Sequence, residues 1–133
     1  YRLPTEAEWE FACRAGTNSA YYSGDTLLDS HEWSIRNSDI KAHPVGTKLP
    51  NPFGLFDMHG NVLEWIEDCY AADYLAGQPL DGAPFAPAAC TYRIARGGSW
   101  SNEPSLLRSA LRAGEPADVR FNNLGFRIAR DAE

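Results

Sequence analysis

Residues 17–52 have neither the apolar spacing of an amphipathic helix nor the alternating pattern of a strand. This stretch is rich in Gly, Ser, Asn and Asp, and it contains Pro44 and Pro50. Such a composition interrupts regular structure and is typical of loops that run over a protein surface. We therefore expect an α+β domain with few short strands and helices, in which polar contacts hold long irregular loops in place.

One helix is predicted near the beginning of the chain. Thr5 and Glu8 have the spacing of a capping box, in which each side chain accepts a hydrogen bond from the backbone N–H of the other residue. Trp9 and Cys13 then fall on one face of the helix, and Gly16 ends it. We expect Cys13 to be a small core residue on that face.

Three short strands and a second helix are predicted further along the chain. The strands are Val62–Asp68, Tyr92–Arg96 and Phe126–Ile128. Leu106–Ala113 is predicted to be a short helix, because two of its arginines lie one turn apart.

The size and composition of the chain fit one domain. It has 133 residues, 44% of them hydrophobic, with four Trp, which is enough to build a core. No stretch approaches the roughly 18 consecutive apolar residues of a membrane-spanning helix. The chain starts at Tyr1 without an initiator Met or a signal-peptide pattern, so we expect a fragment or a processed product of a longer chain.

Charge is distributed unevenly along the chain, whose formal net charge is -6. Residues 1–90 carry five basic and thirteen acidic side chains, whereas residues 91–130 carry seven Arg and three acids. We expect these Arg to hold loops together through hydrogen bonds to carboxylates and backbone carbonyls. A nucleic-acid surface would show more Lys and more exposed aromatic residues, so we expect no nucleic-acid partner.

The three Cys leave the redox compartment open. Cys69 and Cys90 flank a segment rich in Gly, Pro and Ala, and a disulfide between them would tether that long loop. In the chain-entropy model this closure stabilises the fold by roughly 3 kcal/mol. A disulfide would indicate an exported or cell-surface protein, and the alternative is two free thiols at the ends of the loop.

Four ordered segments carry a family resemblance. They are Tyr1–Glu10, Asn51–Trp65, Arg96–Trp100 and Asn122–Arg127. In this order they resemble the formylglycine-generating-enzyme (sulfatase-modifying-factor) family, whose fold is a variant of the C-type lectin fold. The resemblance spans nearly the whole chain but lacks the family's N-terminal portion. It implies that residues 1–133 are the C-terminal part of a single domain of this type.

The same resemblance bears on catalysis. The family's oxidases use two Cys, located after the segment matching Gly97–Ser99, to bind copper and activate oxygen. The matching positions in this chain are Asn102 and Leu107. Leu has no atom that binds a metal, and copper chemistry of this kind needs soft thiolate ligands. We therefore expect no catalytic residues in this chain and no bound copper.

Iron-dependent sulfoxide synthases also use this fold, but a separate N-terminal helical domain supplies most of their iron-binding His. His31, His43 and His59 are scattered along this chain without a metal-binding spacing. We expect His43 and His59 to be packing residues in loops. An oxidoreductase whose catalytic residues lie outside this chain is the alternative interpretation.

Residues 57–64 resemble the family's structural calcium loop. The resemblance implies that Asp57 and Glu64 supply carboxylate oxygens and that the backbone carbonyls of Gly60 and Val62 complete the site. Hard oxygen ligands of this kind suit Ca²⁺, which would fix the loop. The alternative is that Asp57 caps a turn and Glu64 pairs with an Arg. The calcium-dependent sugar-binding motifs of lectins are absent.

Residues 96–127 are also similar to the variable proteins of diversity-generating retroelements. These proteins keep a frame of fixed residues, while template Asn codons altered at their adenines diversify the positions in between. The frame residues here are Arg96–Trp100, Arg108–Ala110, Arg112, Pro116, Arg120, Asn122–Asn123 and Gly125–Arg127. An undiversified member of the family with the same frame is the alternative.

The positions between the frame residues are the candidate ligand-binding set. Those reachable from an Asn codon by adenine changes are Ser101, Leu106, Leu111, Ala113, Gly114, Asp118, Val119 and Phe121, and Trp100 and Glu103 complete the set. Apolar groups exposed on a rigid scaffold are typical of binding surfaces. We expect Trp100, Leu106, Leu111 and Phe121 to be partly exposed in one concave patch.

These inferences predict a non-catalytic module that binds a protein or another macromolecular ligand. The alternatives are the oxidoreductase described above and an accessory domain attached to a kinase, peptidase or signalling protein. Binding of a transition metal by thiol or imidazole would favour the oxidoreductase, whereas an exposed apolar patch favours the binding module.

Overall fold

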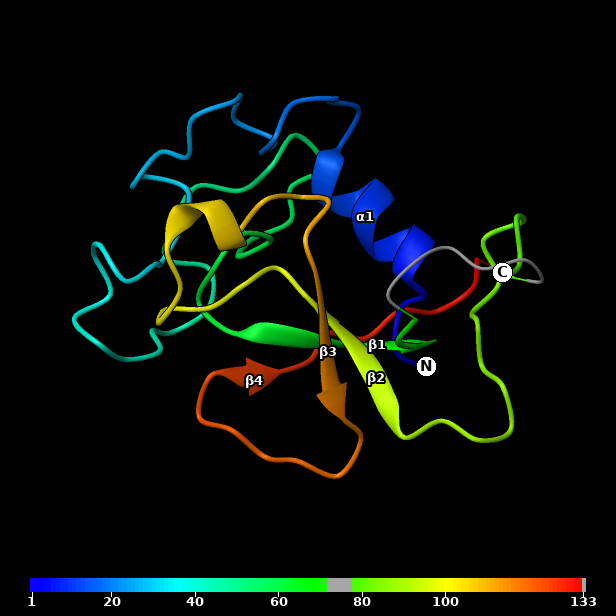
Figure 1. The fold of residues 1–133 in the computed structure, drawn as a ribbon. Helices are drawn as coiled ribbons and strands as arrows, with labels where there is room; N and C mark the ends of the chain where they lie inside the picture. The colour runs from blue at the N-terminus through cyan, green and yellow to red at the C-terminus, as the bar shows by residue number, and fades with distance from the viewer. Residues whose placement is uncertain (72–77, 133) are drawn as a thin grey trace.

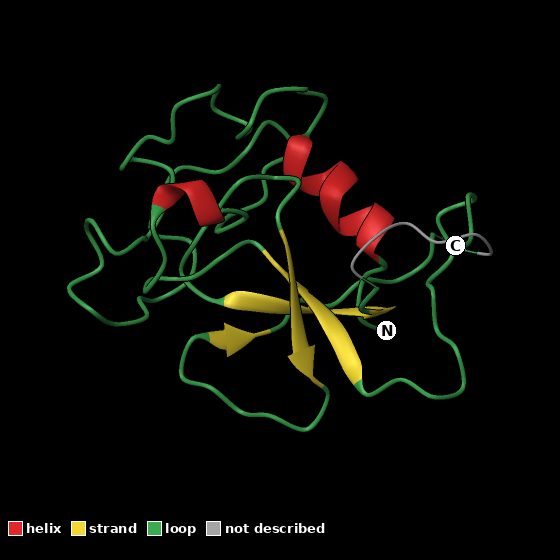
Figure 2. Cartoon of the chain, viewed as in Figure 1, coloured by secondary structure: helices red, strands yellow, loops and turns green. Residues whose placement is uncertain are grey.

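The computed structural model describes residues 1–71 and 78–132, in which one α-helix packs against a four-stranded sheet among long loops (Figures 1 and 2). The elements are α1 (Glu6–Arg14), β1 (Leu63–Cys69), β2 (Tyr92–Arg96), the short 3₁₀ helix η1 (Pro104–Leu106), β3 (Arg112–Pro116) and β4 (Leu124–Gly125). The predicted α+β class, with few short elements and long irregular loops, is confirmed.

The strands are ordered β3-β2-β1-β4 across the sheet. β2 runs antiparallel to both β1 and β3, and β4 pairs in parallel with β1. The predicted strand Tyr92–Arg96 matches β2, and the predicted strand Val62–Asp68 corresponds to β1 shifted by one residue. β3 lies at one edge of the sheet and pairs with β2 along its whole length.

The predicted capping box starts α1. The hydroxyl of Thr5 accepts a hydrogen bond from the Glu8 N–H at 3.2 Å, and the Glu8 carboxylate accepts one from the Thr5 N–H at 2.8 Å. Trp9 and Cys13 are buried, so the predicted core face of the helix is confirmed. No helix in the described part of the chain is long and apolar enough to cross a bilayer.

Two apolar clusters form the core. The first consists of Trp9, Cys13, Tyr22, Met58, Ile66 and Ile94, and the second consists of Tyr21, Leu27 and Leu107. Both clusters therefore include residues of the irregular 17–52 segment. Burying a large apolar side chain contributes about 1.5–3 kcal/mol, so these loop residues hold their segment against the rest of the domain.

Arginines fix the remaining loops, as predicted from their clustering in residues 91–130. Arg112 binds the carboxylate of Glu6 in α1, with Nε 2.6 Å from Oε1, and the fully buried Arg96 lies against the same carboxylate. Arg127 binds both carboxylate oxygens of Glu64, each at 2.6 Å. These pairs connect the C-terminal third of the chain to α1 and β1.

The predicted helix at Leu106–Ala113 is wrong. Its first residue ends η1, and its last two residues begin β3. The backbone of Arg112 pairs with β2, and its guanidinium binds Glu6. Helix propensity is a weak preference, and here the sheet pairing and the ion pair outweigh it.

The predicted strand at Phe126–Ile128 is also wrong, because the sheet pairing stops at Gly125. Arg127 turns inwards to bind Glu64, whereas its two neighbours are exposed. The apolar–charged–apolar alternation is therefore real, but it reflects an inward ion pair and not a strand.

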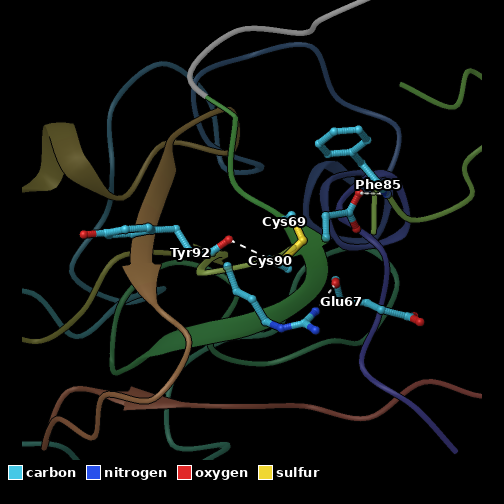
Figure 3. The surroundings of a disulfide bond; sticks show 7 residues. Glu67, Cys69, Phe85, Cys90 and Tyr92 are labelled. Carbon is cyan, nitrogen blue, oxygen red and sulfur yellow. Dashed lines mark hydrogen bonds between the residues drawn. A yellow bond between two sulfur atoms is a disulfide. The ribbon is translucent and has the colours of Figure 1, made fainter. Parts of the chain in front are cut away.

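A disulfide joins Cys69, the last residue of β1, to Cys90, which precedes β2 (Figure 3). The two Cα atoms are 5.7 Å apart, a usual separation for a disulfide. The Cys69 N–H also donates to the carbonyl of Phe85 at 2.7 Å. The loop between β1 and β2 is therefore tied to the end of β1, and of the two alternatives that the sequence left open the structure has the disulfide and not the free thiols.

Candidate ligand-binding surface

The candidate surface begins at the tight turn after β2. Gly97 and Gly98 have φ angles of 96° and 66°, which residues with a Cβ rarely adopt. A Cβ on Gly98 would lie 2.7 Å from the Leu106 carbonyl oxygen and 2.8 Å from Cδ1 of Leu107. Glycine at position 98 therefore lets the end of η1 pack directly on the turn.

Leu107 is the buried anchor of this packing. Its side chain is inaccessible to solvent, belongs to the second apolar cluster and lies against both Gly60 and Gly98. Its carbonyl accepts a 2.6 Å hydrogen bond from Nδ1 of the buried His59. Burial lowers the pKa of His59 to about 4, so the ring is neutral at pH 7 and its Nδ1 carries the donated proton.

Asn102 also has a structural role, because it holds the turn through hydrogen bonds. Its side-chain oxygen accepts hydrogen bonds from the N–H and the hydroxyl of Ser99, both at 2.9 Å. Its carbonyl accepts the Ile35 N–H at 3.1 Å. Asn102 and Leu107, which the family resemblance leads us to expect at the positions of the copper-binding Cys, therefore hold the turn and the core.

The three Cys do not replace that pair. Cys69 and Cys90 are joined in the disulfide, and Cys13 is buried in the first apolar cluster. Burial raises the pKa of the Cys13 thiol to about 12, so the thiolate that copper chemistry needs is disfavoured there.

The predicted ligand-binding residues differ in exposure. Leu106 and Phe121 are 42% and 50% exposed, as expected. The expectation that Trp100 is partly exposed is wrong, because Trp100 is only 9% exposed and belongs to the buried core residues. Among the others, Ser101, Glu103 and Asp118 are exposed, and Leu111, Ala113, Gly114 and Val119 are partly exposed. None of the ten residues lines either of two cavities of about 260 and 380 Å³ in the described part of the chain.

Polar contacts bring the two ends of the segment together. Nε1 of Trp100 lies 3.5 Å from the carbonyl oxygen of Asn122, and Nδ2 of Asn123 lies 3.3 Å from Oγ of Ser101. Because Asn122 directly follows Phe121, these contacts place Phe121 close to residues 100 and 101. The structure therefore brings the beginning and the end of the candidate segment into one neighbourhood.

β3 divides the central candidates between two faces of the sheet. Arg112 points towards α1, where it binds Glu6, and Gly114 lies on the same face because successive residues of a strand alternate. Ala113 lies on the opposite face. The helix-side face of β3 is covered at Gly114 by the ring of Tyr70, a residue that no sequence feature indicated.

The cavity of about 380 Å³ lies at the predicted calcium loop, and its lining includes Asp57, Gly60, Val62 and Glu64. Oδ2 of Asp57 accepts the Gly46 N–H at 2.8 Å, whereas its buried Oδ1 has no hydrogen-bond partner among the described residues. Among those residues, no three His, Cys, Asp or Glu side chains converge as a metal site. A calcium ion here would therefore depend on backbone oxygens as well as carboxylates.

The alternative interpretation of the loop is also realised. Glu64 accepts two hydrogen bonds from Arg127 and a third, at 2.8 Å, from the indole N–H of Trp9. A carboxylate has about four acceptor positions, so these bonds leave capacity on Glu64 for a cation. The orphaned Asp57 oxygen and the hard oxygen set are compatible with Ca²⁺.

The fold and the turn after β2 define the chain as a scaffold of the sulfatase-modifying-factor type. Residues 1–132 match the Sulfatase-modifying factor enzyme 1-like domain, and the chain belongs to this family. The family resemblance predicted from the four segments is therefore confirmed.

Curated relatives include two kinds of protein. The chain is 38% identical over 130 residues to serine/threonine-protein kinase pkn1 of Chlamydia caviae, covering 97% of this chain and 21% of the kinase. It is 35% identical over 149 residues to the formylglycine-generating enzyme of Streptomyces coelicolor, covering 99% of this chain and 47% of the enzyme. The chain thus spans between a fifth and a half of these relatives.

Two solved structures share the fold closely. Treponema denticola variable protein 1 superposes with a TM-score of 0.82 at 39% identity, over 94% of this chain and 45% of that protein. PvdO from Pseudomonas aeruginosa superposes with a TM-score of 0.84 at 32% identity, over 94% of this chain and 50% of that protein. One solved relative is therefore a variable protein, as the frame in residues 96–127 led us to expect.

Proposed function

We propose that this chain is a non-catalytic module that binds a protein or another macromolecular ligand through residues 100–121. The observation that carries the proposal is the exposure of Leu106 and Phe121 on a segment that Asn102 and Leu107 fix from below. Exposed apolar groups on a rigid support lose little conformational freedom on binding, so more of their burial energy becomes affinity.

The finer proposal is that the chain is a variable protein of a diversity-generating retroelement. The 39% identity to Treponema denticola variable protein 1 and the frame around the candidate positions support it. Changes at exposed positions such as Ser101 or Phe121 alter the surface without emptying the core. A reverse-transcriptase gene with a near-identical template repeat beside this gene is the expected finding. Its absence would leave an undiversified binding module.

A phage-displayed random peptide library tests the binding function directly. We expect peptides enriched on the wild-type protein to lose most of their affinity for Phe121→Ala, because the aromatic contact area is removed. Phe53→Ala is the matched control, since Phe53 is 51% exposed but lies outside the candidate segment. Peptides that bind Phe121→Ala as tightly as they bind the wild type and Phe53→Ala would contradict the proposed surface.

Two alternative functions each have one supporting observation. The 35% identity to a formylglycine-generating enzyme favours an oxidoreductase, whose catalytic residues would have to lie outside this chain. The 38% identity to a chlamydial kinase favours an accessory domain within a larger signalling protein. The accessory role is compatible with ligand binding, whereas the oxidoreductase requires metal chemistry that Asn102 and Leu107 do not provide.

We also propose a structural calcium ion at Asp57 and Glu64, completed by the carbonyls of Gly60 and Val62. The orphaned Asp57 oxygen beside a cavity supports the site. A ligand that binds only the folded state raises the melting temperature. We expect the melting temperature of the wild type to be higher in calcium than in a chelator. The melting temperature of Asp57→Ala should be the same in both. An unchanged wild-type midpoint would argue against the ion.

The disulfide supports a further proposal, that the protein works in an oxidising compartment such as the cell exterior. Alkylation of native protein immediately after cell lysis should leave Cys69 and Cys90 unmodified until a reductant is added. Immediate labelling of both residues would contradict an exported location.

A further inference from the structure

Tyr70 lies flat on the middle of the edge strand. A Cβ built on Gly114 would meet three carbons of the Tyr70 ring, Cγ at 2.6 Å, Cδ1 at 2.7 Å and Cδ2 at 2.9 Å. Real Cβ atoms essentially never come this close, so the ring occupies the space that any side chain at position 114 would need.

The backbone of Gly114 does not itself require glycine. Its φ angle is not in the positive range that excludes other residues, and it pairs with Ile94 in a regular antiparallel register. Any L-residue is therefore compatible with the strand backbone, and the nearest obstacle among the described residues is the aromatic ring above it. Position 114 is also one of the candidate ligand-binding positions.

The backbone around Tyr70 is held from both sides. Cys69 is fixed by the disulfide, and the Tyr70 N–H donates to the Tyr92 carbonyl at 2.9 Å. The carbonyl of the next residue, Ala71, accepts a 2.8 Å hydrogen bond from Arg112. A side chain at position 114 would therefore displace the Tyr70 ring by rotation about its side-chain bonds, because the backbone is anchored.

We propose that Tyr70 and residue 114 are a coupled pair that determines the specificity of the binding surface, an inference that rests on the proposed binding function. With glycine at position 114 the half-exposed ring stays on β3, near the Arg112 guanidinium 5.7 Å from its centroid. With any larger residue the ring swings outwards and becomes an aromatic contact for the ligand. One substitution at position 114 thus changes two side chains of the surface.

A double-mutant cycle tests the coupling without a ligand. Gly114→Ala should lower the melting temperature when Tyr70 is present, because the new methyl group forces the ring out of its packed position. In a Tyr70→Ala background the same change should be neutral or stabilising, since alanine suits a strand interior better than glycine. If Gly114→Ala shifted the melting temperature equally in the wild-type and Tyr70→Ala backgrounds, the proposal would be overturned.

Tyr92→Ala is the matched control for this cycle. Tyr92 is also an exposed tyrosine next to the disulfide-linked loop, but the three described atoms nearest to a Cβ on Gly114 all belong to Tyr70 and none to Tyr92. Removing it should leave the effect of Gly114→Ala intact. If Gly114→Ala no longer lowered the melting temperature in a Tyr92→Ala background, a loosened loop and not displacement of the Tyr70 ring would explain the coupling. That result would overturn the inference.

Specificity is tested with the same random peptide library. Peptides selected on the wild type should bind Gly114→Ser at least tenfold more weakly, and in a Tyr70→Ala background the Gly114→Ser change should no longer alter their affinity. Peptides that bind Gly114→Ser and the wild type equally, while still depending on Phe121, would overturn the Tyr70 proposal and leave the binding function standing. If no peptide were enriched on the wild type or on any variant, the binding function would be overturned and this inference with it. This would hold even if the double-mutant cycle showed coupling in the melting temperatures.

Discussion

Leu106 and Leu107 are neighbours with opposite surroundings. Leu107 is fully buried, whereas Leu106 is exposed at the end of η1. We expect Leu107→Ala to lower the free energy of unfolding by about 2–5 kcal/mol, the usual cost of emptying a core site. Leu106→Ala should change it by no more than about 0.5 kcal/mol and should weaken peptide binding instead.

Urea denaturation of the two variants measures the difference. Since they remove the same atoms one residue apart, any general effect of losing a leucine cancels in the comparison. A tolerated Leu107→Ala would mean that the position matching a copper-binding Cys is not part of the core.

His59 makes the stability of the domain depend on pH. Burial lowers its pKa from 6.5 to about 4, so the unfolded chain binds a proton more readily than the folded protein does. The associated stability is therefore fully present above pH 6.5 and is lost as the pH falls towards 4. The loss amounts to about 3 kcal/mol, since one pKa unit corresponds to about 1.4 kcal/mol.

Unfolding free energies measured between pH 7 and pH 4 test this contribution. The wild type should lose stability more steeply in that window than His59→Gln, whatever the absolute stability of the variant. Parallel curves for the two proteins would show that the His59 ring is accessible to protons in the folded state.

The disulfide acts at the scale of two strands, because it ties the end of β1 to the residues that lead into β2. Its reduction should lower the free energy of unfolding by about 3 kcal/mol, as expected for a closed loop of roughly 20 residues. The comparison is made in denaturation curves with and without reductant. A Cys69→Ser, Cys90→Ser double variant should unfold like the reduced wild type and should not respond to reductant.

Elements with a local signal in the sequence, such as α1, β1 and β2, could be predicted, and an element without one, such as β3, could not. The capping box at Thr5 and Glu8 is contained within one turn, and α1 begins there in the structure. β3 has no local signal, because its backbone is organised by β2 and its Arg112 by Glu6, about a hundred residues earlier. The spacing of arginines was therefore misinterpreted as a helix.

The same distinction applies to the candidate site. The residue types at Asn102 and Leu107 could be interpreted from the sequence, because an amide and an isobutyl group cannot replace two thiolates. The contact between Tyr70 and Gly114 could not be predicted, since it exists only when three strands pair in their observed register. The burial of Trp100 could not be predicted either, since its backbone is held by hydrogen bonds to residues 38 and 61, which are distant in the sequence.

At the scale of the whole molecule, stability and the proposed recognition reside in different residues. The two apolar clusters and the Arg–carboxylate pairs hold the domain together, whereas most candidate binding residues lie at its surface. A scaffold built in this way tolerates change at the surface because few core contacts are lost. There are two exceptions: Trp100 is buried, and at Gly114 the neighbouring Tyr70 couples a surface position to packing.

The proposed absence of catalysis is tested most directly by assaying the longest natural form of the protein for aldehyde formation. The protein is incubated with copper(I), oxygen and a peptide carrying the cysteine substrate motif of sulfatases, and aldehydes are detected with a hydrazide probe. The Streptomyces coelicolor formylglycine-generating enzyme serves as the positive control. We expect no aldehyde and no copper retained after desalting, whereas conversion of the peptide cysteine to formylglycine would contradict a non-catalytic binding module.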